Sequence, residues 1–172
     1  MTLTGPAVPG PVPAMAEITV WSLPKALLTA LPETAPVLAA LAADAFDLDD
    51  DDLAEVADEV AAEPDGGSGS RLDRINALLG LNLHAEYDAF RILGAAADKV
   101  LIKAIDTGND ELAGRCAEFL EAVLDSADGH LHDAVALLLE SAQWTGERWT
   151  GLRVIAGPHL SQRMDQREGP AL

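Results

Sequence analysis

The sequence is poor in cysteine, aromatic residues and basic residues, and each shortage excludes a class of protein. The single cysteine, Cys116, rules out an intramolecular disulfide and a thiolate metal cluster. Only 11 residues are Lys or Arg, against 29 Asp or Glu, which gives a formal charge of −18. Nucleic acids and anionic membranes bind through Lys and Arg, so we expect neither as a partner. No apolar run approaches the roughly 20 residues that a membrane span needs.

Motifs that carry catalytic or cofactor chemistry are also missing. The sequence has no GxSxG, no P-loop and no GxGxxG pattern. The Gly-Gly-Ser-Gly run at 66–69 lacks the lysine of a phosphate-binding loop. No Glu is followed by His at the third position, as a carboxylate-bridged metal centre in a helical bundle requires. The sequence therefore predicts no catalytic residue, no cofactor and no metal, and a protein that is not an enzyme.

What the sequence does contain favours an all-α fold. Apolar residues make up 49% of it, mostly Ala, Leu and Val, and Ala and Leu are strong helix formers. Proline and glycine divide the chain into a disordered tail at 1–16, an acidic helical segment at 17–63, a flexible loop at 64–71 and a helical core domain at 72–172. The N-terminus lacks the basic start of a secretory signal, which predicts a cytoplasmic protein.

The spacing of apolar residues predicts several helices. Ser22 can cap one that begins near Leu23, and Pro32 ends it. A longer helix is expected from about 85 to 106, where no proline occurs. Residues at +3 and +4 intervals predict its inward face. That face is made of Phe90, Leu93, Ala97, Val100 or Leu101, and Ala104.

Two similar helices are expected next, at 110–124 and 129–142. Asn109 or Asp110 can cap the first and Asp128 the second. Glu111 and Arg115 have the i,i+4 spacing of an ion pair. After a turn-rich link at 145–151, a short helix is expected at 149–155 and a last one from Pro158 to about 166.

The helices at 110–124 and 129–142 also resemble each other in sequence. Aligned with an offset of 19, they match Cys116 with Val135, Phe119 with Leu138 and Glu121 with Glu140. Helices of this length joined by short turns pack antiparallel, as in HEAT-like units. We therefore expect an antiparallel helical array with HEAT-like pairs in the second half, although any two amphipathic helices match in part.

Clusters that suggest metal binding have simpler interpretations. The run Asp47–Asp52 lacks the glycine of a calcium loop and is typical of a helix N-terminus, where acids face the positive end of the dipole. His130 and His132 are two residues apart and point to different faces of a helix. Cys116 lies on an apolar stripe, where it acts as a small hydrophobe.

Four residues are candidates for contact with a partner. Glu121 and Glu140 follow apolar pairs at the same place in the two similar helices, which predicts a position at an interhelical groove. Trp144 and Trp149 bracket a turn, and tryptophan is favoured at interaction surfaces. The alternative for both tryptophans is a lid over the end of the core.

The second half is similar to a family of small helical bacterial proteins of uncharacterised function. The resemblance covers about residues 84–165. Its features are the turn Asn109–Leu112, the helix end Phe119–Glu121, the run Ala134–Glu140, and Gly157–Pro158 opening a final helix. Some members of that family sit beside polymorphic toxins and are thought to act as immunity proteins. The resemblance implies no catalytic residue.

We therefore expect a non-enzymatic protein-binding module, of which an immunity or antitoxin-like protein that neutralises a basic toxin domain is the most concrete form. Acidity attracts a basic partner, and it also keeps an Ala-rich protein soluble. The alternative is a scaffold that self-associates, for example as a homodimer through an exposed Ala/Leu face. An enzyme with an unorthodox helical site is a third class.

Overall fold

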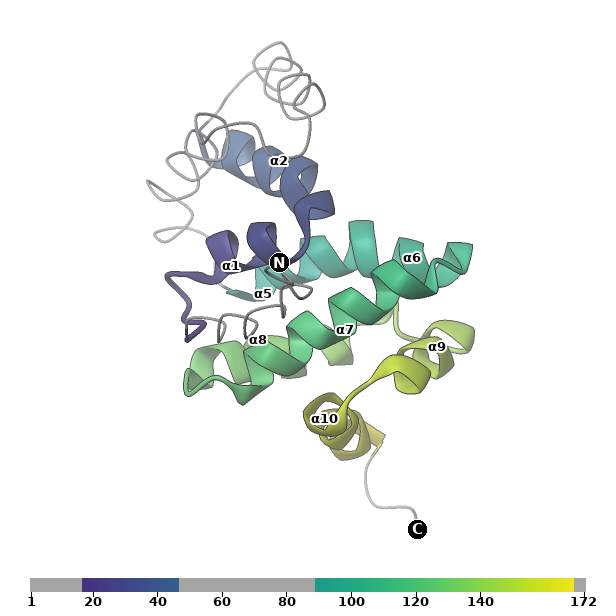
Figure 1. Ribbon diagram of the computed structural model, residues 1–172. Helices are drawn as coiled ribbons and strands as arrows, with labels where there is room; N and C mark the ends of the chain where they lie inside the picture. The colour runs from purple at the N-terminus through teal and green to yellow at the C-terminus, as the bar shows by residue number, and fades with distance from the viewer. Residues whose placement is uncertain (1–16, 47–88, 169–172) are drawn as a thin grey trace, which may run out of the picture.

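The computed structural model describes residues 17–46 and 89–168, and these residues form helices without any strand (Figure 1). The all-α expectation is confirmed for this part of the chain. The predicted tail at 1–16, the acidic run Asp47–Asp52 and the loop at 64–71 lie outside the described residues. No described helix has the length and apolar character to cross a bilayer.

The N-terminal described segment holds α1 (Leu23–Ala30), a 3-10 turn η1 (Pro32–Thr34) and α2 (Ala35–Phe46). Proline in the first turn of α1 and Pro32 after its end set its limits, as predicted. The Ser22 side chain does not cap α1; its hydroxyl accepts instead from the Thr19 amide at 2.9 Å. Buried Thr34 stabilises η1, in which it is the last residue, because its Oγ1 donates to the Leu31 carbonyl at 2.6 Å.

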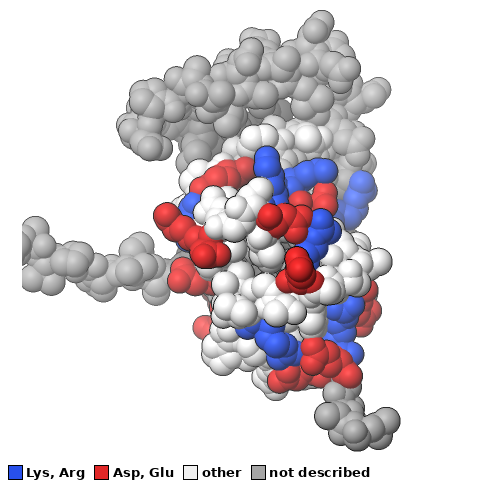
Figure 2. Space-filling view, turned by 90° about the vertical axis from the view of Figure 1, so that its right-hand side faces the viewer, with Lys and Arg blue, Asp and Glu red and all other residues white. Residues whose placement is uncertain are grey.

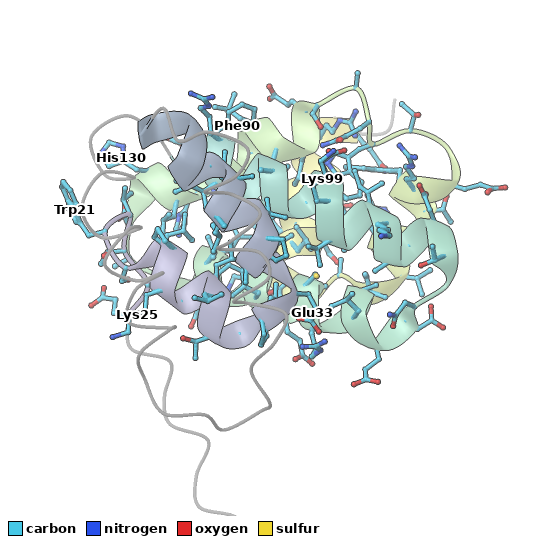
Figure 3. All side chains as sticks on the ribbon, turned by 90° about the horizontal axis from the view of Figure 1, so that it is seen from above. Trp21, Lys25, Glu33, Phe90, Lys99 and His130 are labelled. Atoms are coloured by element: carbon cyan, nitrogen blue, oxygen red, sulfur yellow. The ribbon has the colours of Figure 1, made fainter. Side chains whose placement is uncertain are left out.

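The long helix contains an irregularity that the sequence did not predict. α5 (Ala89–Ala96) and α6 (Ile102–Thr107) are joined by one π-helical stretch, η2 (Ala97–Leu101). A π turn holds more residues than an α turn and therefore shifts which positions face inward. Here both Val100 and Leu101 are buried, whereas Phe90 is 36% exposed, so its predicted inward position is wrong. Figure 3 shows both Phe90 and Trp21 at the edge of the molecule.

The next two helices begin as predicted. Gly108 ends α6 in the left-handed conformation, with φ 68°, which favours glycine because it has no Cβ. The Asn109 side chain caps α7 (Asp110–Asp125) by accepting from the Leu112 amide, and Asp128 caps α8 (Gly129–Glu140) by accepting from the His130 amide. Asp128 also accepts from the Val20 amide at 2.9 Å and so fixes the N-terminal segment to this turn.

The C-terminal helices α9 (Glu147–Ile155) and α10 (Pro158–Glu168) pack against the lower side of α7 in Figure 1. α9 starts at Glu147, inside the stretch predicted as a link at 145–151. Gly146, the residue before the first turn of α9, has a positive φ of 57°, a conformation that glycine adopts readily.

One apolar cluster joins all these elements. Residues from α1, α2 and every helix between α5 and α10 contribute to it. α8 is central, since it packs on α5, α7 and α10. The packing of α8 is more extensive on α5 than on its sequence neighbour α7. The packed helical array is therefore established, whereas HEAT-like pairing is not.

Candidate functional site

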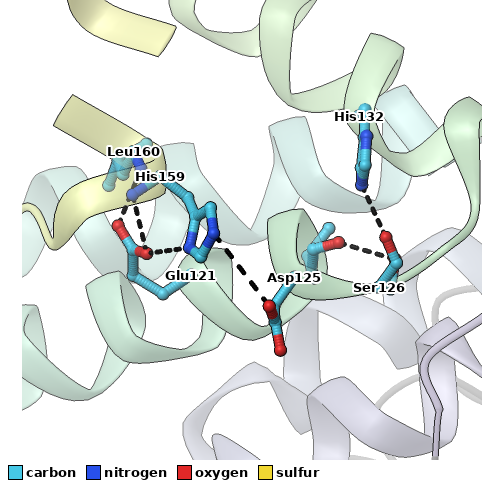
Figure 4. Close-up of polar contacts among 7 residues, drawn as sticks. Glu121, Asp125, Ser126, His132, His159 and Leu160 are labelled. Carbon is cyan, nitrogen blue, oxygen red and sulfur yellow. Dashed lines mark hydrogen bonds and ion pairs between the residues drawn. The ribbon is translucent and has the colours of Figure 1, made fainter. Parts of the chain in front are cut away.

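Glu121 occupies the contact between α7 and α10 (Figure 4). Its Oε1 accepts from the Leu160 amide at 2.7 Å, and its Oε2 accepts from the His159 amide at 3.1 Å and lies 3.0 Å from His159 Nδ1. The side chain is only 18% exposed. A carboxylate at this position satisfies two free amides at a helix N-terminus and faces the positive end of the dipole. Glu121 therefore holds α10 in place.

Gly157 leaves room for this carboxylate. A Cβ at Gly157 would lie 2.6 Å from Glu121 Cδ and 2.7 Å from Glu121 Oε1, closer than atoms can approach. The Gly-Pro pair thus has a packing reason as well as a conformational one. His159 Nε2 also lies 4.0 Å from Asp125 Oδ1, so two carboxylates of α7 flank this imidazole ring.

The other three predicted contact residues lie in different environments. Glu140 is exposed at the end of α8, so it does not share the groove position of Glu121. Trp144 is 1% exposed and packs in the core, and its Nε1 has no hydrogen-bond partner among the described residues. Trp149 is half-buried; its Nε1 donates to Glu168, and the Arg167 guanidinium lies 4.4 Å from its ring centroid. These four residues do not form one surface.

The exposed side of α7 carries a row of acids that the sequence analysis did not single out. Glu111, Glu118 and Asp125 are all exposed and recur at intervals of seven residues. Seven residues are nearly two helical turns, so the three carboxylates lie in line with a spacing of about 10 Å. The seven-residue interval was the available signal. We call these three residues the α7 acidic row.

A neighbouring ion pair has a different partner from the one predicted. Arg115, which lies between Glu111 and Glu118, bonds Glu33 of η1 rather than Glu111. Its Nη1 is 3.3 Å from Glu33 Oε2, and the pairing lowers the pKa of Glu33. Tertiary packing brings η1 beside α7 and supplies a closer carboxylate than the i−4 position. The basic residue within the α7 acidic row is therefore already neutralised.

Charge is distributed unevenly over the described helices. Residues 110–140, spanning α7 and α8, hold eight acids and one base, a formal charge of −7. Residues 147–168, spanning α9 and α10, hold three acids and four bases, a formal charge of +1. Figure 2 shows acidic and basic side chains side by side on the face that carries the ends of α6 and α9. The excess of acid lies on α7 and α8.

Two side chains that could bind a metal or act as a nucleophile, His132 and Cys116, have structural surroundings. Within 17–46 and 89–168, no group of three His, Cys, Asp or Glu side chains is arranged to hold a metal ion. His132 Nε2 lies 2.8 Å from the Ser126 carbonyl oxygen (Figure 4). Cys116 is buried, and burial raises the pKa of its thiol to about 11, which disfavours the nucleophilic thiolate.

Comparison of the chain with protein-family models, with characterised proteins and with solved structures finds no match. The resemblance to small helical bacterial proteins is thus left as an expectation from the sequence. A functional proposal rests on the geometry and charge of this chain.

Proposed function

We propose that the protein is a non-enzymatic binding module that takes a basic protein partner on the exposed side of α7. The observation that carries the proposal is the α7 acidic row, Glu111, Glu118 and Asp125. Glu111 and Glu118 make no ion pair or side-chain hydrogen bond with the described residues, and the side chain of Asp125 is 80% exposed. These carboxylates are available to an external cation.

The expected partner follows from the geometry of the row. Lys or Arg side chains about 10 Å apart, as on one side of a helix, would match the spacing of the carboxylates. Exposed charge pairs of this kind increase the association rate and weaken as salt screens them. An immunity-like role against a basic toxin domain is the most concrete form of this function, and it rests on the charge and on the resemblance in sequence.

The same proposal includes a HEAT-like arrangement of α7 and α8. The matched positions Cys116 and Val135, and Phe119 and Leu138, are buried in both helices, which supports a common inward face. Glu121 and Glu140 differ in exposure and so break the correspondence at the helix ends. In helical repeat arrays, exposed helix faces are surfaces that bind other proteins.

The alternative, a self-associating scaffold, has less support among the described residues. The large apolar side chains that are exposed, Trp21, Phe90, Leu137 and Val154, come from the turn before α1 and from α5, α8 and α9. Scattered exposed apolar residues are normal on a monomer. The experiment below nevertheless separates the two functions.

The experiment is affinity capture from the native organism with the full tagged chain at low and moderate salt. Three forms are compared: the wild type, the triple variant Glu111→Gln, Glu118→Gln, Asp125→Asn, and a control with the same charge change, Asp133→Asn, Glu140→Gln, Glu147→Gln. We expect a basic protein that binds the wild type and the control, is lost from the α7 variant and leaves as salt rises. Equal capture by all three forms, or recovery of the chain alone, would contradict the proposal.

A further inference from the structure

α9 and α10 are bound to each other mainly by polar contacts. Arg153 Nη1 donates to Asp165 Oδ1 at 2.8 Å. Its Nη2 lies 3.0 Å from Glu168 Oε2, an ion pair without hydrogen-bond geometry. Trp149 of α9 adds two contacts, because it donates to Glu168 and lies beneath the guanidinium of Arg167. These contacts tie the two helices into one unit, which we call the C-terminal pair.

Besides packing on α6, α7 and α8, the C-terminal pair makes four polar contacts with the rest of the described chain, one of them between His159 and Asp125 at 4.0 Å. Arg148 binds Asp106 of α6 through two bonds, of 2.9 and 2.7 Å. Glu121 of α7 binds the N-terminus of α10. Arg167 donates to the Trp144 carbonyl at 3.2 Å. The contact between Arg148 and Asp106 is solvent-exposed, with both side chains 41% exposed, so water competes for it.

The pair packs on α6, α7 and α8, and it buries fewer apolar residues than α7 or α8 does. Leu152 is the only fully buried residue of α9, and Leu160 and Met164 are those of α10. α7 alone buries seven residues and α8 five. Segments with few buried apolar contacts open locally at a lower free energy than the whole domain unfolds. Along the described chain, residues 141–146 link the pair to α8. The pair can therefore move away without breaking another helix.

We infer that α9 and α10 open together as one cooperative unit while α5 to α8 stay folded, and that Glu121 is the latch that holds the unit closed. Opening uncovers the side of α7 and α8 on which α10 packs, below α7 in Figure 1. Glu111 and Glu118 of the α7 acidic row lie on exposed positions away from the pair, whereas Asp125 lies 4.0 Å from His159 of α10, so the two proposals share this one residue.

The test is native-state hydrogen exchange on the full chain, read for the hydrogen-bonded amides of α7, α8, α9 and α10. In the wild type, amides of α9 and α10 should exchange through one common opening, faster than those of α7 and α8. Glu121→Gln removes the charge from the latch and should speed exchange in both α9 and α10 about tenfold, as expected for loss of a hydrogen bond to a charged group. Exchange in α7 and α8 should not change.

A second variant tests whether the pair is one unit. Arg148→Gln removes an anchor of α9 only, and it should speed exchange in α10 as well, by a smaller factor. Asp133→Asn, at an exposed position of α8 without an ion pair or side-chain hydrogen bond to the described residues, is the matched control and should change nothing. The inference is overturned if Glu121→Gln affects α10 alone and Arg148→Gln affects α9 alone. Protection of the pair equal to that of α7 would also overturn it.

Discussion

The helix pair α7–α8 and the helix pair α9–α10 are built by different physics. α7 and α8 bury Phe119, Val123, Leu131 and Val135 among other apolar residues, and their N-termini are capped by their own neighbouring side chains. α9 and α10 bury three large side chains, and the N-terminus of α10 is capped by Glu121 from a different helix. Apolar burial therefore dominates the packing of α7–α8, whereas α9–α10 combines a smaller apolar contact with several polar contacts.

Charge separates the two pairs as well. The α7–α8 stretch uses few of its acids internally, so a row of carboxylates is available at the surface. The α9–α10 stretch uses Arg148, Arg153 and Arg167 for contacts within the protein. Exposed charges on α7 and α8 are therefore available to a partner. On α9 and α10, the arginine charges are used in contacts that hold these helices in place.

The largest expected effect on stability is a cavity in α8. Leu131 is fully buried, so Leu131→Ala should lower the free energy of unfolding by about 2–5 kcal/mol, through lost apolar contact and the space left behind. Urea unfolding followed by circular dichroism measures this change. Leu137→Ala, at a 51% exposed position of the same helix, should stay within about 0.5 kcal/mol. Equal losses at both positions would show that α8 is not packed as described.

Two glycines offer a contrast between the pairs. At Gly157 a Cβ would meet Glu121, so Gly157→Ala should displace the carboxylate and destabilise the protein by about 1–3 kcal/mol. At Gly114, within α7, nothing lies within 4 Å of the added atom, and Gly114→Ala should stabilise by about 0.5–1 kcal/mol because alanine favours helix. Thermal unfolding of both variants tests the contrast, and the same sign of change at both sites would refute it.

Asp128 should make an intermediate, pH-dependent contribution at the N-terminus of α8. The amides of Val20 and His130 bind its carboxylate and lower its pKa. Since the folded-state pKa is lowered, the stabilisation is present above the ordinary value of 3.8 and is lost as pH falls through the lower folded value. Asp128→Ala should cost about 1 kcal/mol near pH 7, as for other N-cap losses. Urea unfolding at several pH values should show the difference from wild type shrinking in acid, and a constant difference would contradict this cause.

The smallest expected effect is the ion pair between Arg115 and Glu33. Both side chains are more than a third exposed, so Arg115→Gln should lower stability by about 0–1 kcal/mol, and less as salt rises. Urea unfolding at low and high salt measures it. A loss as large as that of Leu131→Ala would mean that α7, like α9 and α10, depends on a polar contact for its packing. That result would remove the contrast between the two pairs.

Local signals were enough to predict much of the fold. The caps Asn109 and Asp128, the stop at Gly108 and the start at Pro158 depend on nearby residues, and all are confirmed. The π turn at 97–101 was not predicted, because the +3 and +4 spacing assumes a regular α-helix throughout. Its consequence is that Val100 and Leu101, which the spacing offered as alternatives, are both buried.

The candidate site was harder to predict because it depends on long-range contacts. Glu121 was singled out for its position after an apolar pair, yet its role is set by the N-terminus of α10, 38 residues away. Arg115 has an acid at i−4, but packing brings Glu33 closer. The seven-residue interval of the α7 acidic row is present in the sequence, but only burial shows which acids of α7 are exposed and which, like Glu121, bind other parts of the chain.

The most direct test of the binding role is the affinity of the captured partner for purified protein, measured at low and moderate salt. For the wild type and the Asp133, Glu140, Glu147 control, we predict similar affinities that fall as salt rises. For the Glu111, Glu118, Asp125 variant, we predict weak binding at both salts. Wild-type affinity in that variant, or binding that does not respond to salt, would contradict an electrostatic role for the exposed side of α7.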